Sequence, residues 1–384
     1  MKPRIALATS VVYFIEWFLI DQIRRATGEY QVDVYVQTGD TELLRRRGID
    51  ARVIPTAIER KIRLWRDLSA LWRLWRSFRR ERYVLVHSTG PKGGLLAMTA
   101  AWLAGVPVRV HTFTGQVWTG SSGLARLILK AADRVTSLFA THILVDSPSQ
   151  RRFLLDEGVV GESGSRVLLD GSISGVDVGR FAPDPTRRRE RRAEWGITNH
   201  AFVVLFLARF TRDKGALVMA EGFARFCHDF AGDAHLLMVG PDEEVLTPRI
   251  REICHGCADR VHLHGYTRVP EDFMAASDVL CLPSFREGFG TVLLNAAACG
   301  IPSVASRIYG SEDAVVDGET GLLIPAGDSA ALAEVLARLA ADPELRARLG
   351  SQGRMRAESR FAESVVTDAV MDFYRAELRK KNRL

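Results

Sequence analysis

Short, apolar, β-branched runs alternate with longer amphipathic stretches along the whole chain, and this alternation constrains the fold most strongly. Such short runs are typical of strands buried on both faces, and each stretch between them can form a crossover helix. The pattern therefore predicts repeated βα units around parallel sheets. The expected strands are 5–8, 31–36, 52–54, 84–87, 108–112, 142–145, 167–169, 201–207, 234–239, 261–263, 279–282, 303–305 and 321–324. The expected helices of the first half are 14–26, 62–80, 94–104 and 124–139.

The chain length and one Gly/Pro-rich segment predict two domains. At 384 residues the chain is too long for one α/β core. Gly171–Gly179, followed by two prolines and the charge run Arg187–Arg192, has the composition of a linker. We expect two Rossmann-like, doubly wound parallel-sheet domains, 1–172 and 173–361, facing a central cleft. A helix at about 362–384 should pack back on the first domain, and ligands should bind outside the carboxyl ends of the strands.

The composition excludes several protein classes. Hydrophobic residues at 47% and charged residues at 26% are typical of a globular protein rather than a disordered chain or a disulfide framework. No apolar run reaches the roughly 18 residues of a spanning helix, and five scattered cysteines favour reduced thiols in the cytoplasm. The net charge of +6, mostly from arginine, suggests an anionic partner. Nucleic acid is disfavoured, because the chain has neither zinc-finger spacing nor an aromatic RNP-type strand.

Two turns in the second half carry the residue types of an anion site. After the strand that ends at Leu282, a turn holds Glu287, and Gly288–Gly290 then opens a helix. The first N–H groups of such a helix attract anions. Arg209 and Lys214 follow the first strand of this half, where two cations can clamp a diphosphate.

Together with Gly240–Asp242 and Gly175–Asp177, these turns resemble family 4 of the nucleotide-sugar glycosyltransferases, which have the GT-B fold. The resemblance spans about His87 to Pro325, is strongest from Gly265 onward, and points to the branch of capsule, O-antigen and exopolysaccharide biosynthesis. It implies retaining transfer of a sugar from a nucleotide donor, with no metal and no cofactor.

The resemblance also implies roles for individual residues. Arg209 and Lys214 would hold the donor diphosphate, and Glu287 would lie next to the transferred sugar. The backbone that cradles sugar and phosphate would be Gly288, Phe289, Gly290 and Thr291. Asn295 stands where the family has the second Glu of its Glu, seven residues, Glu motif, which binds the ribose. Because an amide carries no charge, we expect a weaker ribose contact.

Three residues of the first half are candidates for the reaction centre and the acceptor site. His111 is expected at the reaction centre, with a strand-end histidine satisfied by the backbone as the alternative. Thr114 occupies the position before Gly115 where many relatives have His. Lys92 lies in a turn that resembles the His-x-x-x-Pro-Lys turn of polysaccharide glycosyltransferases, and we expect it to bind acceptor phosphates unless it is a surface lysine.

The segment Arg60–Arg82 combines eight Arg and one Lys with Leu, Trp and Phe. Its apolar residues fall on one helical stripe, comprising Leu64, Leu68, Leu71, Trp75 and Phe78. This composition is typical of an interfacial helix on anionic lipid, while core packing with solvated arginines is the alternative. The expected membrane-facing residues are Trp65, Trp72, Arg73, Arg76 and Arg79.

A zinc site at Cys254, Cys257, His262 and His264 is disfavoured, because these residues fit an ordinary helix and strand. Together with the Arg-rich segment, the resemblance implies a peripheral enzyme on the cytoplasmic face of the cell membrane. It should be a hexosyl- or N-acetylhexosaminyltransferase that moves sugar from a UDP-sugar to a saccharide on polyprenyl diphosphate. The alternatives are a nucleotide-sugar epimerase of the same fold and a catalytically degenerate binding partner.

Overall fold

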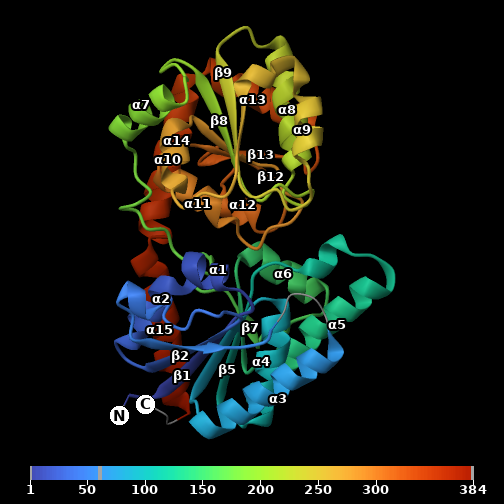
Figure 1. Ribbon diagram of the computed structural model, residues 1–384, viewed down its shortest axis with the longest axis vertical. Helices are drawn as coiled ribbons and strands as arrows, with labels where there is room; N and C mark the ends of the chain where they lie inside the picture. The colour runs from blue at the N-terminus through green and yellow to red at the C-terminus, as the bar shows by residue number, and fades with distance from the viewer. Residues whose placement is uncertain (1, 59–62, 382–384) are drawn as a thin grey trace. The chain divides into compact units, whose positions relative to one another are not determined.

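The computed structural model describes residues 2–58 and 63–381, which form two units (Figure 1). Unit 1 contains the residues up to Gly175 and those from Glu363 onward, and unit 2 is Val176–Ala362. The sequence places the first boundary after residue 172 and the structure places it after residue 175. No helix within the described residues is long and apolar enough to cross a bilayer.

Unit 1 contains a seven-stranded, wholly parallel sheet in the order β3-β2-β1-β4-β5-β6-β7. Successive side chains of β1 point to opposite faces, so Ile5 and Leu7 join one core cluster while Ala6 and Ala8 join another. Burial on both faces explains why the strands are apolar runs. The strands are β1 (Arg4–Ala8), β2 (Gln31–Val36), β3 (Ala51–Pro55), β4 (Leu85–Thr89), β5 (Val108–Phe113), β6 (His142–Val145) and β7 (Ser165–Arg166).

The helices of unit 1 cover both faces of this sheet. On one face α4 packs against both α3 and α5, and on the other α15 packs against α2. The hydroxyl of Tyr374 on α15 hydrogen-bonds Nδ1 of His87 on β4. The helices are α1 (Val12–Phe14), α2 (Ile20–Thr27), α3 (Leu64–Glu81), α4 (Pro91–Leu103), α5 (Gly123–Phe139), α6 (Pro148–Asp156) and α15 (Glu363–Lys380).

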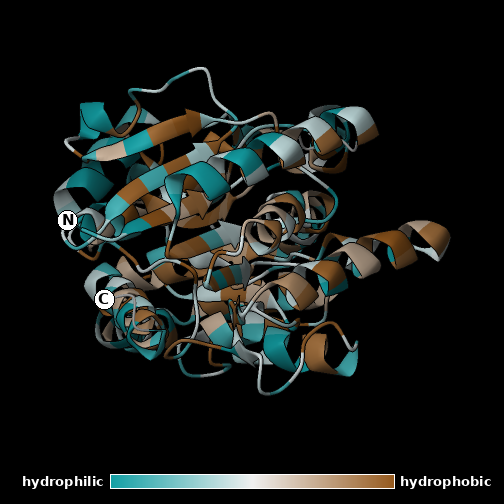
Figure 2. Cartoon of the chain, turned by 90° about the horizontal axis from the view of Figure 1, so that it is seen from below, coloured by the Kyte–Doolittle hydropathy of each residue, from teal (hydrophilic) through white to brown (hydrophobic). Residues whose placement is uncertain are grey.

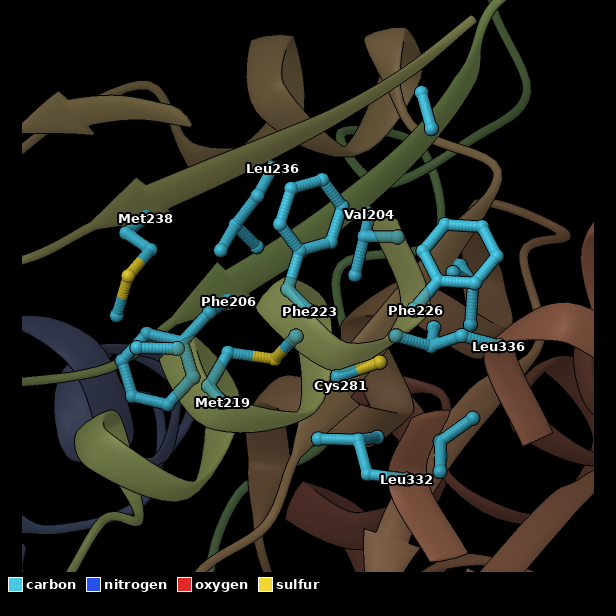
Figure 3. Close-up of a cluster of buried hydrophobic side chains, with 14 of the residues drawn as sticks. Val204, Phe206, Met219, Phe223, Phe226, Leu236, Met238, Cys281, Leu332 and Leu336 are labelled. Carbon is cyan, nitrogen blue, oxygen red and sulfur yellow. The ribbon is translucent and has the colours of Figure 1, made fainter. Parts of the chain in front are cut away.

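Unit 2 contains a six-stranded parallel sheet in the order β10-β9-β8-β11-β12-β13. Its strands are β8 (Phe202–Leu207), β9 (Ala234–Val239), β10 (Val261–His264), β11 (Val279–Leu282), β12 (Ser303–Ser306) and β13 (Gly321–Ile324). Its helices are α7 (Pro185–Glu194), α8 (Ala216–Asp229), α9 (Thr247–Ile253), α10 (Pro270–Ala276), α11 (Thr291–Ala298), α12 (Ser311–Ala314), α13 (Ser329–Ala341) and α14 (Pro343–Arg360). In Figure 3 the side chains of β8, α8 and α13 interdigitate in one of its cores. Two parallel sheets with alternating helices confirm the predicted fold class.

The structure differs from the predicted elements in three places. A π-helical turn at Ile15–Leu19 interrupts the helix expected over 14–26. No strand forms at 167–169, where one was expected, and the two-residue β7 lies directly before these positions. The charge run Arg187–Arg192 was expected in a linker, which is wrong, because it forms most of α7. Asp184 caps this helix by accepting the N–H of Arg187 at 2.9 Å, and Pro185 occupies its first turn.

One arginine of α7 is fully buried. Arg192 donates to the carbonyl oxygens of Ala276 at 2.8 Å and Ala201 at 2.9 Å, and its Nη2 lies 2.8 Å from Oδ2 of Asp278. Arg192→Ala should therefore lower the free energy of unfolding by about 3 kcal/mol or more, because two carbonyls lose a buried charged donor and Asp278 keeps only Arg188 and the Val203 N–H as partners. Urea denaturation of the full chain measures this. Arg189→Ala, at an exposed position on the same helix, is the control and should have almost no effect; equal losses would contradict the assignment.

Candidate active site

The predicted donor residues of unit 2 lie at the carboxyl ends of β8 and β11, where the strand order reverses. In doubly wound sheets this is the place where ligands bind. The loops after the two strands are in direct contact, since Phe285 N–H donates to the Asp213 carbonyl at 2.8 Å. Gly215 has φ +73°, and a Cβ there would lie 2.0 Å from the Pro283 carbonyl oxygen. Only glycine allows this close approach.

Lys214 and Glu287 form an ion pair across these loops. The Lys214 Nζ lies 2.7 Å from Oε1 of Glu287, and the Ser284 hydroxyl donates to the same oxygen at 2.8 Å. Glu287 is buried, with 8% of its surface exposed. No described residue bonds to its Oε2. The carboxylate is thus held in one orientation through Oε1, and its role beside the sugar stays a prediction.

Arg209 lies at the other side of the same loop. Its Nη1 is 2.6 Å from Oε2 of Glu243, which follows β9, and its side chain is 37% exposed. Asp213 accepts from Arg286 at 2.9 Å. Burial alone would raise the pKa of Asp213, but hydrogen bonds from Thr211 and Arg286 lower it below its ordinary value. The site therefore holds three cations, Arg209, Lys214 and Arg286, interleaved with fixed carboxylates.

The helix α11 begins directly beside this cluster. Gly290, with φ +76°, precedes Thr291, and no side chain caps the first turn. The loop between β12 and α12 packs closely here, because a Cβ on Gly310 would lie 2.5 Å from the Gly288 carbonyl oxygen. The uncapped N–H groups of α11 and its positive dipole end therefore lie next to Glu287, which suits a phosphate.

Asn295 lies one turn further along α11. Thr291 and Asn295 are four residues apart and therefore share one helix face, and both are half-buried. The Asn295 side chain hydrogen-bonds no described residue. Its predicted contact with the ribose of the donor stays a prediction.

His111 belongs to unit 1 and is fully buried on β5. Its Nδ1 lies 2.9 Å from the Ser88 hydroxyl, so the ring pairs with a side chain rather than with backbone as the alternative had it. A Cβ on Gly94 would lie 2.3 Å from its Cε1. Burial, together with neighbouring His87, lowers the pKa of His111 to about 3. The ring is therefore neutral at physiological pH, and its role at a reaction centre stays a prediction.

The two acceptor candidates follow adjacent strands of unit 1. Lys92 comes after β4 and its Nζ lies 2.6 Å from Oδ1 of Asp67 on α3, so it is ion-paired. Thr114 comes directly after β5 and is half-buried. Both occupy the carboxyl edge of the sheet, where acceptor phosphates were predicted to bind, and that role stays a prediction.

The five residues predicted to face a membrane, which are Trp65, Trp72, Arg73, Arg76 and Arg79, are all exposed on α3. The guanidinium of Arg76 lies over the Trp72 ring at 5.4 Å. The buried face of α3 consists of Ala70, Leu74 and Phe78, so the predicted stripe does not pack as a unit. Leu64 and Leu68 lie in solvent.

Sequence reasoning missed several residues of the site, namely Ser284, Asp213, Arg286 and Glu243. The only available signal was their proximity in sequence to Glu287, Arg209 and Gly240. Among the described residues, no cluster of three His, Cys, Asp or Glu side chains has the geometry to hold a metal. Cys254 contacts the Ala220 carbonyl at 3.6 Å, whereas His262 contacts His235 at 3.0 Å.

Comparisons with known proteins match both units. Residues 187–356 match the family Glycosyl transferases group 1, and residues 21–164 match the Glycosyl transferase 4-like domain. The capsular polysaccharide biosynthesis glycosyltransferase CapM of Staphylococcus aureus is 28% identical over 91% of this chain and 91% of its own length. The UDP-Gal:alpha-D-GlcNAc-diphosphoundecaprenol alpha-1,3-galactosyltransferase of Escherichia coli is 27% identical over 77% of this chain and 76% of its own. Anabaena HepE, solved with UDP and glucose, has a TM-score of 0.81 at 20% identity, covering 98% of this chain and 100% of that one.

The two parallel-sheet units and these matches together identify a glycosyltransferase of the GT-B fold. The two halves match the group 1 and the 4-like glycosyltransferase families, so the chain belongs to glycosyltransferase family 4. This confirms the predicted resemblance.

Glu287→Ala and Lys214→Ala should each lower turnover by about two to three orders of magnitude, because each removes one preorganised electrostatic contact. Release of nucleoside diphosphate from the donor measures turnover, and circular dichroism checks the fold. Glu319→Ala, at an exposed carboxylate, is the matched control and should behave as wild type. Transfer at the wild-type rate by either site variant would refute the site.

Acid should destabilise unit 1. Burial lowers the pKa of His87 and of His111 to about 3. Below the ordinary value of about 6.5 the unfolded chain therefore binds protons that the folded unit excludes. The free energy of unfolding should fall by up to about 1.4 kcal/mol per pH unit for each histidine as the pH drops from about 6.5. Amide exchange of β4 and β5 measures this.

In that experiment His111→Gln should halve the contribution of His87 and His111 to the slope of the unfolding free energy against pH, since one of the two titrating groups is lost. His200→Gln, at an exposed position, should leave the slope unchanged. If the amides of β4 and β5 stay equally protected from exchange down to pH 5, the two rings are not held neutral.

Proposed function

We propose that this glycosyltransferase transfers a sugar from a UDP-sugar to a saccharide carried on polyprenyl diphosphate, in the assembly of a bacterial surface polysaccharide. The ion pair of Lys214 with Glu287 beside the start of α11 carries this proposal, because it combines phosphate-binding and sugar-orienting groups. The E. coli relative is named for a UDP-Gal donor and a diphosphoundecaprenol acceptor. The HepE structure was solved with UDP and glucose. CapM is named for capsular polysaccharide.

The diphosphate of the donor would lie against Arg209, Lys214 and the first turn of α11. In this structure Nη1 of Arg209 is ion-paired with the Glu243 carboxylate, and a bound diphosphate would replace that carboxylate. Arg209 and Lys214 are fixed before the reaction and would stabilise the negative charge that develops on the leaving phosphate. With two cations and a helix terminus in place, phosphate neutralisation needs no metal, and we propose a metal-independent reaction.

The sugar would be oriented by Oε2 of Glu287, while Oε1 stays bound to Lys214 and Ser284. In the reaction the bond between C1 of the sugar and the β-phosphate oxygen breaks, and the acceptor hydroxyl oxygen bonds to C1. The proton of that hydroxyl passes to the departing phosphate. Attack from the face that the phosphate leaves retains the configuration at C1. The transferred group would be a hexose or an N-acetylhexosamine.

The donor is tested by incubating the chain with single UDP- and GDP-sugars and a short-chain polyprenyl diphosphate saccharide. Mass spectrometry detects the glycosylated lipid, and proton NMR gives the configuration at C1 and identifies any epimerised donor. We expect one UDP-sugar to give a glycosylated lipid with retained configuration, and EDTA to leave the rate unchanged. Epimerised donor in the absence of acceptor would indicate an epimerase instead. Donor binding without any turnover would indicate a degenerate binding protein.

We also propose that α3 places the enzyme on the anionic inner face of the cell membrane. Its exposed Trp65 and Trp72 and the arginines at positions 73, 76 and 79 support this, since aromatic and cationic residues are typical of interfacial helices. Changing the three arginines to Gln should reduce flotation with anionic vesicles. Equal flotation of both proteins would refute the contact.

Asn295→Glu should lower the KM for the donor severalfold with little change in kcat. A carboxylate would replace neutral hydrogen bonds to the ribose, worth roughly 0.5 to 1.5 kcal/mol, by charge-assisted ones worth about 1.5 to 3. Ribose binding is shared by the ground and transition states, so kcat should hardly move. Asn295→Ala should raise KM. Loss of kcat in a folded Asn295→Glu variant would show that the position does not bind ribose.

A further inference from the structure

The helix α5 turns its apolar side to solvent. Its exposed apolar residues recur at offsets 0, 3, 4, 11 and 14, which places them on one face of the helix. Surface helices of globular domains normally turn such a face toward the core. The residues, with their exposed fractions, are Leu124 (71%), Leu127 (64%), Ile128 (55%), Val135 (36%) and Leu138 (75%).

Polar contacts hold α5 in this orientation. Only Asp133 and Thr136 are fully buried on the helix. Trp118, itself completely buried, donates from Nε1 to Oδ2 of Asp133 at 2.8 Å. Arg126 and Lys130 also turn inward, where both lie over the Trp118 ring, at 5.1 and 5.5 Å. Rotating α5 to bury its leucines would break all these contacts.

Glu157 reinforces this inward polar face. Its Oε1 lies 3.0 Å from Arg126 and its other oxygen pairs with Lys130. The hydrogen bond from Lys130 and the charge of both cations lower the pKa of Glu157, so the anchor stays ionised at physiological pH. The cations of α5 are therefore used to fix the helix, and its outer surface is left apolar.

The exposed apolar surface continues over the neighbouring helices. At the end of α4, Trp102 stacks on Phe139 of α5 at 4.6 Å and is still 49% exposed. On the other side of α4, the first half of α3 exposes Leu64 (74%), Trp65 (86%), Leu68 (55%) and Trp72 (51%). Figure 1 shows α3, α4 and α5 on the same side of the sheet, and Figure 2 shows hydrophobic colour on outlying helices as well as on strands.

We infer that the outer face of α5 inserts into the headgroup and acyl boundary of an anionic bilayer, with α3 as its electrostatic partner. The helix α3 carries five arginines and two acidic residues. Both acids are already neutralised, Asp67 by Lys92 and Glu81 by Arg4. A bilayer supplies both the apolar layer for α5 and the negative charge for α3.

A second copy of the chain fits this surface less well. In a twofold interface both copies contribute the same patch, so the five arginines of each α3 would be gathered at one interface, while the two acids of the helix are already paired. The inference deepens the proposed function, on which it rests in part, because a saccharide on polyprenyl diphosphate is itself held at a bilayer. The exposed stripe spans about 21 Å along the helix, at ~1.5 Å per residue, which is long enough to lie flat in the interface.

The test is flotation of the full chain with vesicles of phosphatidylcholine alone and with added phosphatidylglycerol. The variant carries Leu124→Gln, Leu127→Gln and Ile128→Gln. The control carries Val245→Gln, Val269→Gln and Met355→Gln, three exposed apolar positions of unit 2. The α5 variant should lose about tenfold or more in the vesicle partition coefficient, while the control binds as wild type. Unchanged thermal unfolding confirms that both variants fold.

Equal partition of wild type and the α5 variant would overturn the inference, and so would a wild type that binds neither vesicle. A concentration-dependent dimer that the α5 variant abolishes, with no flotation, would assign the face to a second copy instead. Transfer to a short-chain acceptor in detergent separates the two proposals. The α5 variant should keep this activity and lose transfer to acceptor embedded in vesicles. Flotation without any transfer by wild type would refute the proposed function and leave the membrane face standing.

Discussion

The ion pair between Lys214 and Glu287 is the contact on which the candidate site depends. It joins the loops that follow β8 and β11, and the two strands are neighbours only because the strand order of the unit 2 sheet reverses between them. The loops come close enough because Gly215 has no side chain. Sheet topology, one glycine and one charge pair thus bring together the cation and the carboxylate to which we assign phosphate binding and sugar orientation.

Much of the fold could be predicted because buried parallel strands leave a signal that is local in the sequence. Apolar runs such as β8 are visible without knowledge of their partners. The charge run of α7 misled the prediction, since burial of Arg192 depends on Asp278, far along the chain. Periodicity predicted α5 as a helix but could not say which face is buried. That choice depends on Trp118 and Glu157, which lie outside the helix.

The sequence predicted those residues of the candidate site that form one contiguous motif. It did not predict the contacts that folding makes between separate segments. Glu287 through Thr291 form one turn, so the sequence shows them together. Ser284 and Asp213 became visible only when the structure showed the Ser284 hydroxyl on Glu287 and the Asp213 carboxylate on Arg286. The burial of His111 beneath Gly94 was equally hidden, because these residues are brought together by packing of α4 on β5.

The return of the chain to unit 1 through α15 has a consequence for synthesis. Unit 2 is one uninterrupted segment, Val176–Ala362, and can complete its core as soon as that segment has left the ribosome. Unit 1 contains the residues that precede unit 2, but until unit 2 has been synthesised it lacks α15 and with it Tyr374, the partner of His87. Unit 1 is therefore translated before unit 2 but completes its fold after it. Until α15 is made, the apolar face of the unit 1 sheet against which it packs needs protection.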